Sequence, residues 1–119
     1  MSISPYKTDN LVLNLSFDFA LDIIAYTESL EGRKKYNMAN QLFRSGTGIH
    51  ANIREAQNAE SKADFIHKMK IAAKEAEETE GWLLLCEHAP LYPEAKEQLT
   101  KLVSILKLLN KIIGTSKAN

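Results

Sequence analysis

The fold is decided by residues 61–83, which read SKADFIHKMKIAAKEAEETEGWL. Apolar or small side chains recur there at intervals of three and four residues, the spacing that places them on one face of an α-helix. This stripe comprises Phe65, Met69, Ala72, Ala76, Thr79 and Leu83. The stretch from Ser61 to Asp64 resembles a capping box with Asp in place of Glu. We therefore predict a helix of about 25 residues that opens at Ser61 and stops at Ala89-Pro90.

Helical spacing also predicts three further helices, over about 16–31, 37–59 and 93–114. Ser16 and Asn37 are the predicted N-caps of the first two, because their side chains can accept a hydrogen bond from an unpaired backbone N–H. Gly32 is the predicted left-handed residue after the first helix, and Pro93 suits the first turn of the last.

The whole pattern is helical, since Pro and Gly number only three and five and no alternating run reaches strand length. Short connections between four helices of similar length make neighbours antiparallel. We therefore predict an all-α fold, an antiparallel up-down-up-down four-helix bundle. It forms a single domain over residues 1–119, with an ordered core over about 15–113.

The first predicted helix carries two apolar stripes on opposite sides. One stripe comprises Phe17, Ala20, Leu21 and Ile24, and the other Phe19, Ile23, Tyr26 and Leu30. One stripe suffices for the core of a monomer, and the second needs another surface to cover it, which suggests oligomerisation. The second and fourth helices each carry one inward stripe: Met38, Leu42, Ser45, Ile49, Ile53 and Ala56, and Ala95, Leu99, Leu102, Leu106, Leu109 and Ile113.

Gly46 and Gly48 lie inside the second predicted helix. Each costs about 1 kcal/mol there relative to alanine. We interpret them as positions where a neighbouring helix packs very closely, with a hinge as the alternative.

The composition excludes several classes of protein. Hydrophobic residues make up 45% and charged residues 25% of the 119, which is not the composition of a disordered chain. The single cysteine excludes a disulfide scaffold. The longest apolar run, Leu83–Cys86, is far short of the ~20 residues of a membrane span, and Met1–Pro5 show no signal-peptide features. We expect a cytoplasmic protein with no membrane partner.

Charge is neutral overall, with 15 basic and 15 acidic residues, but it is distributed in blocks. Residues 33–74 contain nine basic and three acidic groups, and residues 75–97 contain one basic and seven acidic. Each block has a simple interpretation as a solvated helix face, and the alternative is a surface for partners.

In the predicted topology the blocks separate into an acidic and a basic end of a polar rod. The acidic set is Glu75, Glu77, Glu78, Glu80, Glu87, Glu94 and Glu97, and the basic set is Arg54, Lys62, Lys68, Lys70, Lys74, Lys101, Lys107 and Lys111. Arg33-Lys34-Lys35 is a basic exception at the acidic end.

Residues 41–56 read QLFRSGTGIHANIREA. This string resembles the signature of the bacterial four-helix-bundle proteins encoded in intervening sequences of 23S ribosomal RNA genes. Residues 64–68 (DFIHK) and 71–79 (IAAKEAEET), followed by Trp82-Leu83, are similar to the second block of that family. The resemblance extends from about Leu15 to Ile113.

The resemblance implies a ring-like homopentamer. A related branch, the accessory variability determinants of diversity-generating retroelements, forms a basic barrel that binds nucleic acid. This chain departs from the pattern at His50, where the family often has a small residue, and in its neutral charge. The neutral charge argues against binding of nucleic acid over the whole surface.

The signature contains four polar side chains, Gln41, Arg44, Asn52 and Glu55. Arg44 can pair with a carboxylate through its planar fork, and Asn52 can bridge two helices. We expect them to form a buried polar network that fixes helix register or subunit contacts, with a ligand or RNA contact as the alternative.

Catalytic and metal motifs are not found in the sequence. Asp64-x-x-His67 occurs once, whereas a di-iron bundle needs Glu-x-x-His twice, and neither His50 nor His88 has an acid three residues earlier. Cys86 is expected to be a small buried hydrophobe. We therefore predict a protein that is not an enzyme and has no metal and no cofactor.

Two functions compete. In the first, a homo-oligomer binds RNA or DNA through a basic end, with Arg54, Lys62, Lys68, Lys70 and Lys74 as contacts for phosphate. In the second, the protein is a structural ring, or one that binds another protein, and its charges serve solubility and assembly. The resemblance favours the first.

Overall fold

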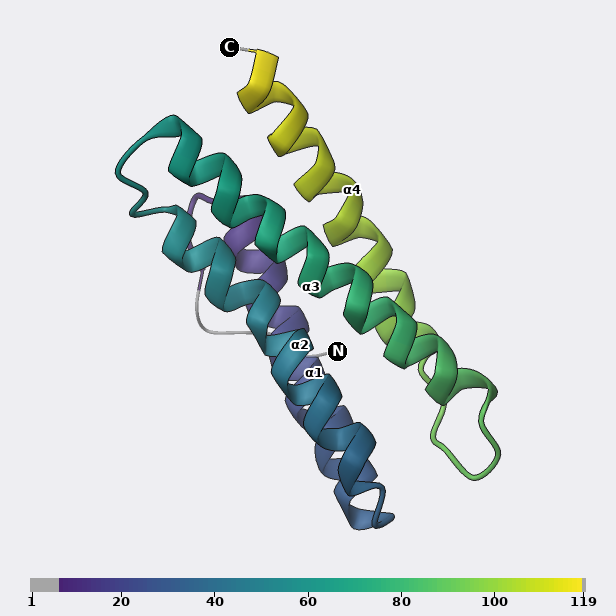
Figure 1. The fold of residues 1–119 in the computed structure, drawn as a ribbon. Helices are drawn as coiled ribbons and strands as arrows, with labels where there is room; N and C mark the ends of the chain where they lie inside the picture. The colour runs from purple at the N-terminus through teal and green to yellow at the C-terminus, as the bar shows by residue number, and fades with distance from the viewer. Residues whose placement is uncertain (1–6, 119) are drawn as a thin grey trace.

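A computed structural model describes residues 7–118, and these form four α-helices with no strand among them. The helices are α1 (Leu11–Gly32), α2 (Tyr36–Ala56), α3 (Lys62–His88) and α4 (Lys96–Ala118). Successive helices run in opposite directions, and α1 and α3 each pack against α2 and α4 (Figure 1). The all-α four-helix bundle predicted from the sequence is confirmed. It is elongated, with extents of 47 × 28 × 21 Å.

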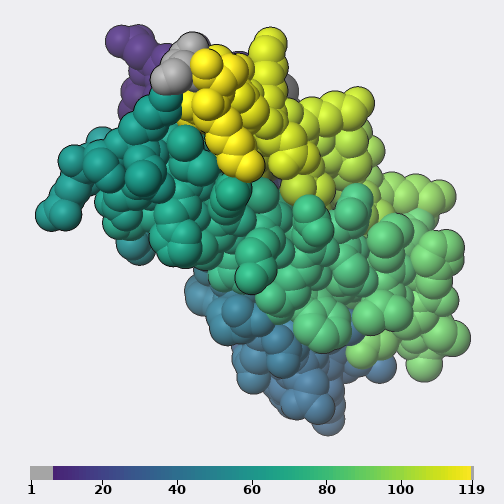
Figure 2. All heavy atoms as spheres, turned by 45° about the horizontal axis from the view of Figure 1, so that its top comes forward, coloured from purple at the N-terminus to yellow at the C-terminus, as the bar shows by residue number. Residues whose placement is uncertain are grey.

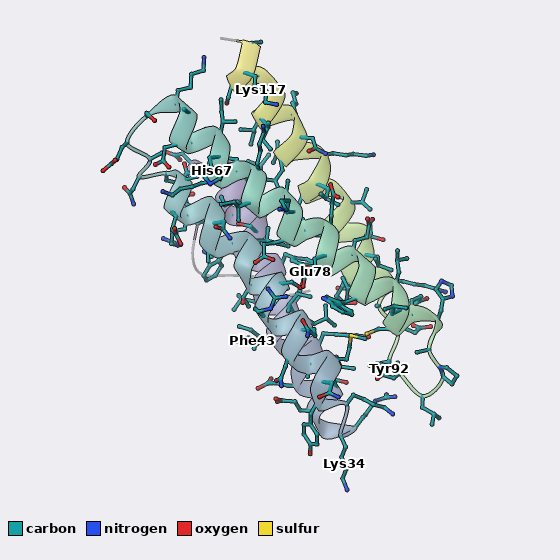
Figure 3. All side chains as sticks on the ribbon, in the orientation of Figure 1. Lys34, Phe43, His67, Glu78, Tyr92 and Lys117 are labelled. Carbon is teal, nitrogen blue, oxygen red and sulfur yellow. The ribbon has the colours of Figure 1, made fainter. Side chains whose placement is uncertain are left out.

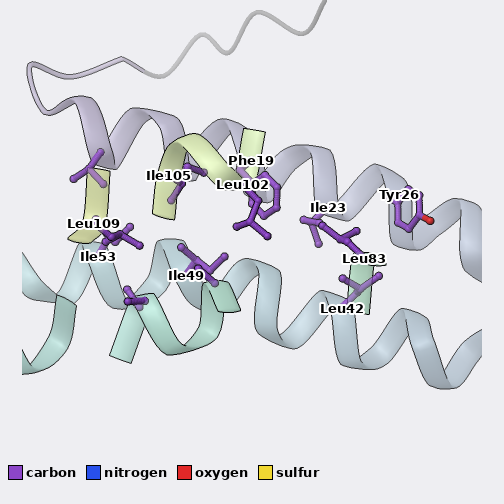
Figure 4. Packing of buried hydrophobic residues seen from close by; sticks show 14 of the residues in the cluster. Phe19, Ile23, Tyr26, Leu42, Ile49, Ile53, Leu83, Leu102, Ile105 and Leu109 are labelled. Carbon is purple, nitrogen blue, oxygen red and sulfur yellow. The ribbon is translucent and has the colours of Figure 1, made fainter. Parts of the chain in front are cut away.

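The core is one cluster of side chains from all four helices, and Figure 4 shows its centre. Of the two stripes of α1, the one containing Phe19 and Ile23 is buried, whereas Leu21 in the other is 37% exposed. The predicted stripes of α2, α3 and α4 all face inward, and their flanking members Met38 and Leu99 are only partly buried. Ile105 joins the core although it was not in the predicted stripe of α4.

The start of α1 differs from the prediction. Asn10 is the N-cap, and its side chain accepts a hydrogen bond from the Leu13 amide at 3.1 Å. Ser16 is a buried residue within the helix, so its prediction as the cap was wrong. Asn10 starts the helix earlier than predicted because its side chain caps a backbone amide of the first turn, the role that Ser16 was expected to fill later in the chain.

The turn between α1 and α2 also differs. Gly32 is still helical, and the left-handed residue is Lys34, with φ of 63°. The N-cap of α2 is Lys35, which makes no side-chain capping bond, so the predicted cap at Asn37 was wrong. The α2 helix ends at Ala56, three residues before the predicted end.

The start of α3 confirms Ser61 as the N-cap, whereas the return bond of the capping box reaches Glu60, one residue before the cap, instead of Ser61. The Ser61 side chain accepts a hydrogen bond from the Asp64 amide at 3.1 Å, and the Asp64 carboxylate accepts one from the Glu60 amide at 3.2 Å. In contrast, α4 begins at Lys96 rather than near Pro93, because residues 89–95 form a loop. It continues past the predicted end at Gly114 to Ala118.

The two glycines of α2 are sites of close approach, as predicted. A Cβ added at Gly46 would lie 2.8 Å from Cγ2 of Ile23 on α1, and one at Gly48 would lie 2.5 Å from the Glu75 carboxylate of α3. Tight packing is therefore confirmed at Gly46 against α1 and at Gly48 against α3.

None of the helices formed by the described residues combines the length and the apolar character needed to cross a bilayer. Met1–Pro5, where the sequence shows no signal-peptide features, lie outside the described residues.

Candidate nucleic-acid interface

The five basic residues predicted to contact phosphate lie toward one end of the bundle. The end of α2, the first half of α3 and the last half of α4 meet there (Figure 1). Arg54 lies in the last turn of α2, and the four lysines lie in the first half of α3. In Figure 3, His67 and Lys117 mark this end, and Lys34 and Tyr92 mark the other.

The lysines of α3 do not share one face. Lys74 follows Lys70 by four residues, so both lie on the same side of the helix, and both are exposed. Lys68 precedes Lys70 by two residues and therefore lies on a different side. The Lys68 ammonium pairs with the Asp64 carboxylate at 3.2 Å, which neutralises much of its charge. The structure thus separates Lys68 from Lys70 and Lys74.

A third lysine completes the group on the outer side of α3. Lys117 near the end of α4 lies close enough to Lys70 that its ammonium group lowers the Lys70 pKa. Among residues 7–118 no carboxylate pairs with Lys70, Lys74 or Lys117. We call these three residues the lysine face; Figure 2 shows α3 and α4 in contact along this side of the molecule. Two neighbouring cations without an acid between them repel each other, and an anion would relieve this repulsion.

Arg54 helps to hold α2 against α1 through His50. Its Nε donates a hydrogen bond to Nε2 of His50 at 3.2 Å, and Nδ1 of that histidine lies 2.9 Å from the Ser16 hydroxyl. Because Nε of Arg54 can only donate, the neutral imidazole carries its proton on Nδ1 and donates to Ser16. Burial and the nearby Arg54 charge lower the His50 pKa. The unusual His50 of the signature therefore holds two helices together.

One predicted member of the basic end is misplaced. Lys101 lies two turns into α4 at the opposite end, where it forms ion pairs with Asp22 of α1 and, at 3.4 Å, with Glu97. Its hydrogen bond to Asp22 raises the Lys101 pKa. The prediction of Lys101 at the basic end was wrong, because α4 starts at Lys96 and its first turns lie among the acids.

The polar residues of the signature lie mainly on the surface. Gln41, Arg44 and Glu55 are exposed in the single chain, and burial of this network at a contact between subunits stays a prediction. Arg44 does bridge α2 to α3, pairing with Glu78 and, at 3.7 Å, with Glu75. It also donates a weak hydrogen bond of 3.4 Å to Gln41.

The other members of this network behave differently. Asn52 does not bridge two helices; its amide donates to the Gly48 carbonyl in its own helix at 2.8 Å. Glu78 also accepts a hydrogen bond from Nε1 of Trp82 at 3.1 Å. Burial raises the Glu75 pKa despite the Arg44 charge.

Sequence reasoning missed Lys117 and the partners of Arg44. Lys117 was missed because the apolar stripe of α4 fades before Gly114, so the helix was ended too early. The i, i+3 spacing of Glu75 and Glu78 places both on one side of a helix, and this spacing could have indicated the two partners.

Among the described residues no three His, Cys, Asp or Glu side chains gather where they could hold a metal ion. Cys86 is fully buried, and burial raises its thiol pKa, which disfavours the reactive thiolate. Its predicted place in the core is confirmed.

Comparison with known proteins agrees with this architecture. The family model of the 23S rRNA-intervening sequence protein matches residues 8–114. A crystal structure from Bacteroides thetaiotaomicron VPI-5482, described as a protein of unknown function from the S23 ribosomal protein family, is 42% identical with a TM-score of 0.82. The alignment covers 86% of this chain and 97% of that one. No curated protein matches the chain. The chain therefore belongs to the family of 23S rRNA-intervening sequence proteins.

Proposed function

We propose that the protein is a non-enzymatic, cytoplasmic homo-oligomer that binds RNA through the lysine face of each subunit. The observation that carries this proposal is the lysine face itself, in which Lys70, Lys74 and Lys117 from two helices have no acidic partner among the described residues. RNA phosphates supply the anion that such a face lacks. The name of the family, which refers to 23S rRNA, favours RNA over other polyanions.

Oligomerisation makes a small patch sufficient. Three lysines are a weak site for phosphate, since each neutralised phosphate contributes a modest, salt-dependent amount to affinity. Repeating the patch around a homo-oligomer, as in a pentamer, multiplies the effective affinity for one RNA molecule. A neutral chain can therefore bind a polyanion from one end while its acidic end remains in solvent.

Of the other predicted contacts, Lys68 is neutralised by Asp64, and Arg54 serves the α1–α2 junction through His50. Lys62 lies in the first turn of α3, close to this end. We assign these three residues a secondary share of the binding and the lysine face the main share.

The test is fluorescence anisotropy with labelled single- and double-stranded RNA and DNA at ~50 and ~200 mM salt, after light scattering has established the mass. We expect affinity to fall steeply with salt. Lys74→Glu should weaken binding at least about tenfold and lower the salt slope by about one unit per subunit engaged.

The matched control is Lys96→Glu, which makes the same change of charge at the opposite end of the bundle. Lys96 is exposed and contacts Glu87 only at 3.8 Å, so its loss costs under about 1 kcal/mol. If Lys74→Glu and Lys96→Glu weaken RNA binding equally, the loss is a general effect of charge. This result would contradict the lysine face as the binding site. Absence of binding by the wild type at the lower salt would overturn the RNA proposal.

The second candidate is a ring that binds only protein, and it is favoured by exposed apolar side chains such as Leu85 and Leu91. In that case Lys74→Glu changes neither binding nor mass, and affinity capture of protein partners replaces the RNA assay.

A further inference from the structure

Leu91, in the loop between α3 and α4, is held in a conformation that is unfavourable for a leucine. Its φ is 67°, in the left-handed region that branched and bulky residues rarely adopt, at a cost of about 1–3 kcal/mol. Its side chain is 81% exposed, more than any other large hydrophobic residue described. The fold therefore bears a backbone cost at a residue whose apolar side chain faces solvent.

The loop that carries Leu91, residues 89–95, is fixed to the body of the bundle from several sides. Arg33 donates a hydrogen bond to the Leu91 carbonyl at 3.3 Å, and the Tyr26 hydroxyl donates to the Pro93 carbonyl at 2.7 Å. The Lys35 ammonium lies 5.0 Å from the centre of the Tyr92 ring.

The end of the loop is fixed as well, because the Ala95 amide donates to the Glu87 carboxylate at 2.7 Å. Leu91 is therefore a preorganised knob, and its binding to a partner requires little further loss of entropy.

A groove lined by both apolar and polar side chains lies on the other side of the same end of the bundle. It has a volume of about 330 Å³ and lies between the end of α1 and the start of α2. Its residues are Ile24, Thr27, Glu28, Glu31, Ala39, Asn40 and Phe43. Ile24 and the 49% exposed Phe43 supply apolar walls, and two exposed glutamates form the rim. We call it the α1/α2 groove.

The charges of the two surfaces are complementary. The knob is flanked by Arg33 and Lys35, which contact its loop. The groove is flanked by Glu28 and Glu31, and neither has an ion-pair partner within residues 7–118. A loop held by two cations thus meets a groove bordered by two carboxylates.

The positions of the two surfaces determine the kind of assembly. Figure 3 shows Phe43 and Tyr92 on opposite sides of the bundle, at the end marked by Lys34. A two-fold dimer needs knob and groove to face the same partner, so opposite sides require a head-to-tail contact. Such a contact repeats from copy to copy, and the rotation between successive copies decides whether they close into a ring or extend as a filament.

We propose that the Leu91 knob of one copy docks into the α1/α2 groove of the next copy, and that this head-to-tail contact builds the oligomer. The inference rests on the homo-oligomer of the proposed function and names the surfaces that build it. It does not depend on RNA binding, since the lysine face lies at the other end of the bundle.

The test uses light scattering and sedimentation on the full chain and two variants. Leu91→Asp removes the knob and keeps the groove, and Phe43→Asp spoils the groove and keeps the knob. Both side chains are exposed, so both variants should keep their helix content by circular dichroism. Each variant alone should fall to the 13.4 kDa monomer. An equimolar mixture should form a heterodimer, because one intact knob then meets one intact groove.

Leu11→Asp is the control. Leu11 is also a strongly exposed hydrophobic residue, at 61%, but it lies at the basic end of the bundle. It should keep the wild-type mass. A Leu91→Asp variant that keeps the wild-type mass would overturn this contact and leave the oligomer of the proposed function standing. A monomeric wild type would overturn both, and failure of RNA binding alone would leave this inference intact.

Discussion

Gly46 lies where α2 approaches α1 most closely, and a methyl group there has no room. Its added Cβ would lie 2.8 Å from Cγ2 and 2.9 Å from Cγ1 of Ile23, which is itself fully buried in the core. Overpacking of this kind costs about 1–3 kcal/mol, against a gain of about 0.5–1 kcal/mol in helix propensity. We expect Gly46→Ala to lower the free energy of unfolding by about 1–2 kcal/mol in urea titrations.

Gly81 provides the matched control, because it lies in the middle of α3 with nothing within 4 Å of an added Cβ. Gly81→Ala should raise the free energy of unfolding by about 0.5–1 kcal/mol. All variants are compared at one protein concentration, since assembly adds to apparent stability. Equal stabilisation by both alanines would show that Gly46 is not a packing residue.

Single residues were predictable from sequence where their role follows from local spacing. Gly46 in the middle of a predicted helix indicated close packing, and the fork of Arg44 indicated a carboxylate partner. The exposure of these polar side chains in the single chain was not predictable, because it depends on the angle at which α3 covers α2. Asn52 shows the same limit, since its amide had a local acceptor at Gly48 and needed no second helix.

Helix ends were the least predictable elements because several side chains compete to cap them. Asn10 and Ser16 both suit an N-cap, and the hydrogen bonds of Thr8 and Asn14 in the preceding turn favour the earlier one. Lys34 adopts the left-handed turn position in place of Gly32, and its neighbours Arg33 and Lys35 both contact the loop between α3 and α4. The existence of the four helices and the side of each that faces the core were predicted correctly, because both depend on many residues.

The pairing of α1 with α2 should depend on pH through His50. Folding lowers the His50 pKa, through burial and the Arg54 charge, so the unfolded chain binds its proton more readily. The contribution of His50 is therefore fully present above its unfolded pKa of about 6.5 and is lost as pH falls through that value toward the folded pKa. We expect the free energy of unfolding to decrease from pH 7.5 to 5.5.

His50→Gln should flatten this dependence, because glutamine can hydrogen-bond but does not titrate in this range. The measurement is a series of urea midpoints across the same pH range for both proteins. Glu75, whose pKa is raised by burial, acts with the opposite sign and is present in both, so the difference isolates His50. If the free energy of unfolding of His50→Gln depends on pH as steeply as that of the wild type, the role given to His50 between α1 and α2 is contradicted.

At the scale of the molecule, the charges separate along the long axis less completely than the sequence suggested. The first half of α3 and the last half of α4 do bring lysines together, as the antiparallel order of the helices requires. Lys68 is neutralised within α3 and Lys101 belongs to the acidic end, so the basic end reduces to a smaller face. The topology was predictable from connection length, whereas the side of each helix that a lysine occupies depended on exact helix bounds.

The contact between α1 and α4 is the slightest of the four helix contacts, and Lys101 joins it by pairing with Asp22. Asp22 is only 17% exposed, so removing the cation leaves a largely buried carboxylate without its partner. Lys101→Met keeps the apolar stem and removes the charge, and we expect a loss of about 1 kcal/mol. This loss should appear as faster amide hydrogen exchange in α4 next to α1.

Lys107→Met is the matched control, because Lys107 is exposed on the same helix and forms no ion pair within the described residues. It should leave exchange in α4 unchanged. Because α4 is bound to α3 more extensively than to α1, the Lys101 variant should open α4 along its α1 side while α2 and α3 stay protected. Uniform acceleration of exchange in all four helices would instead mean that the bundle opens as one unit, with no weaker seam between its first and last helices.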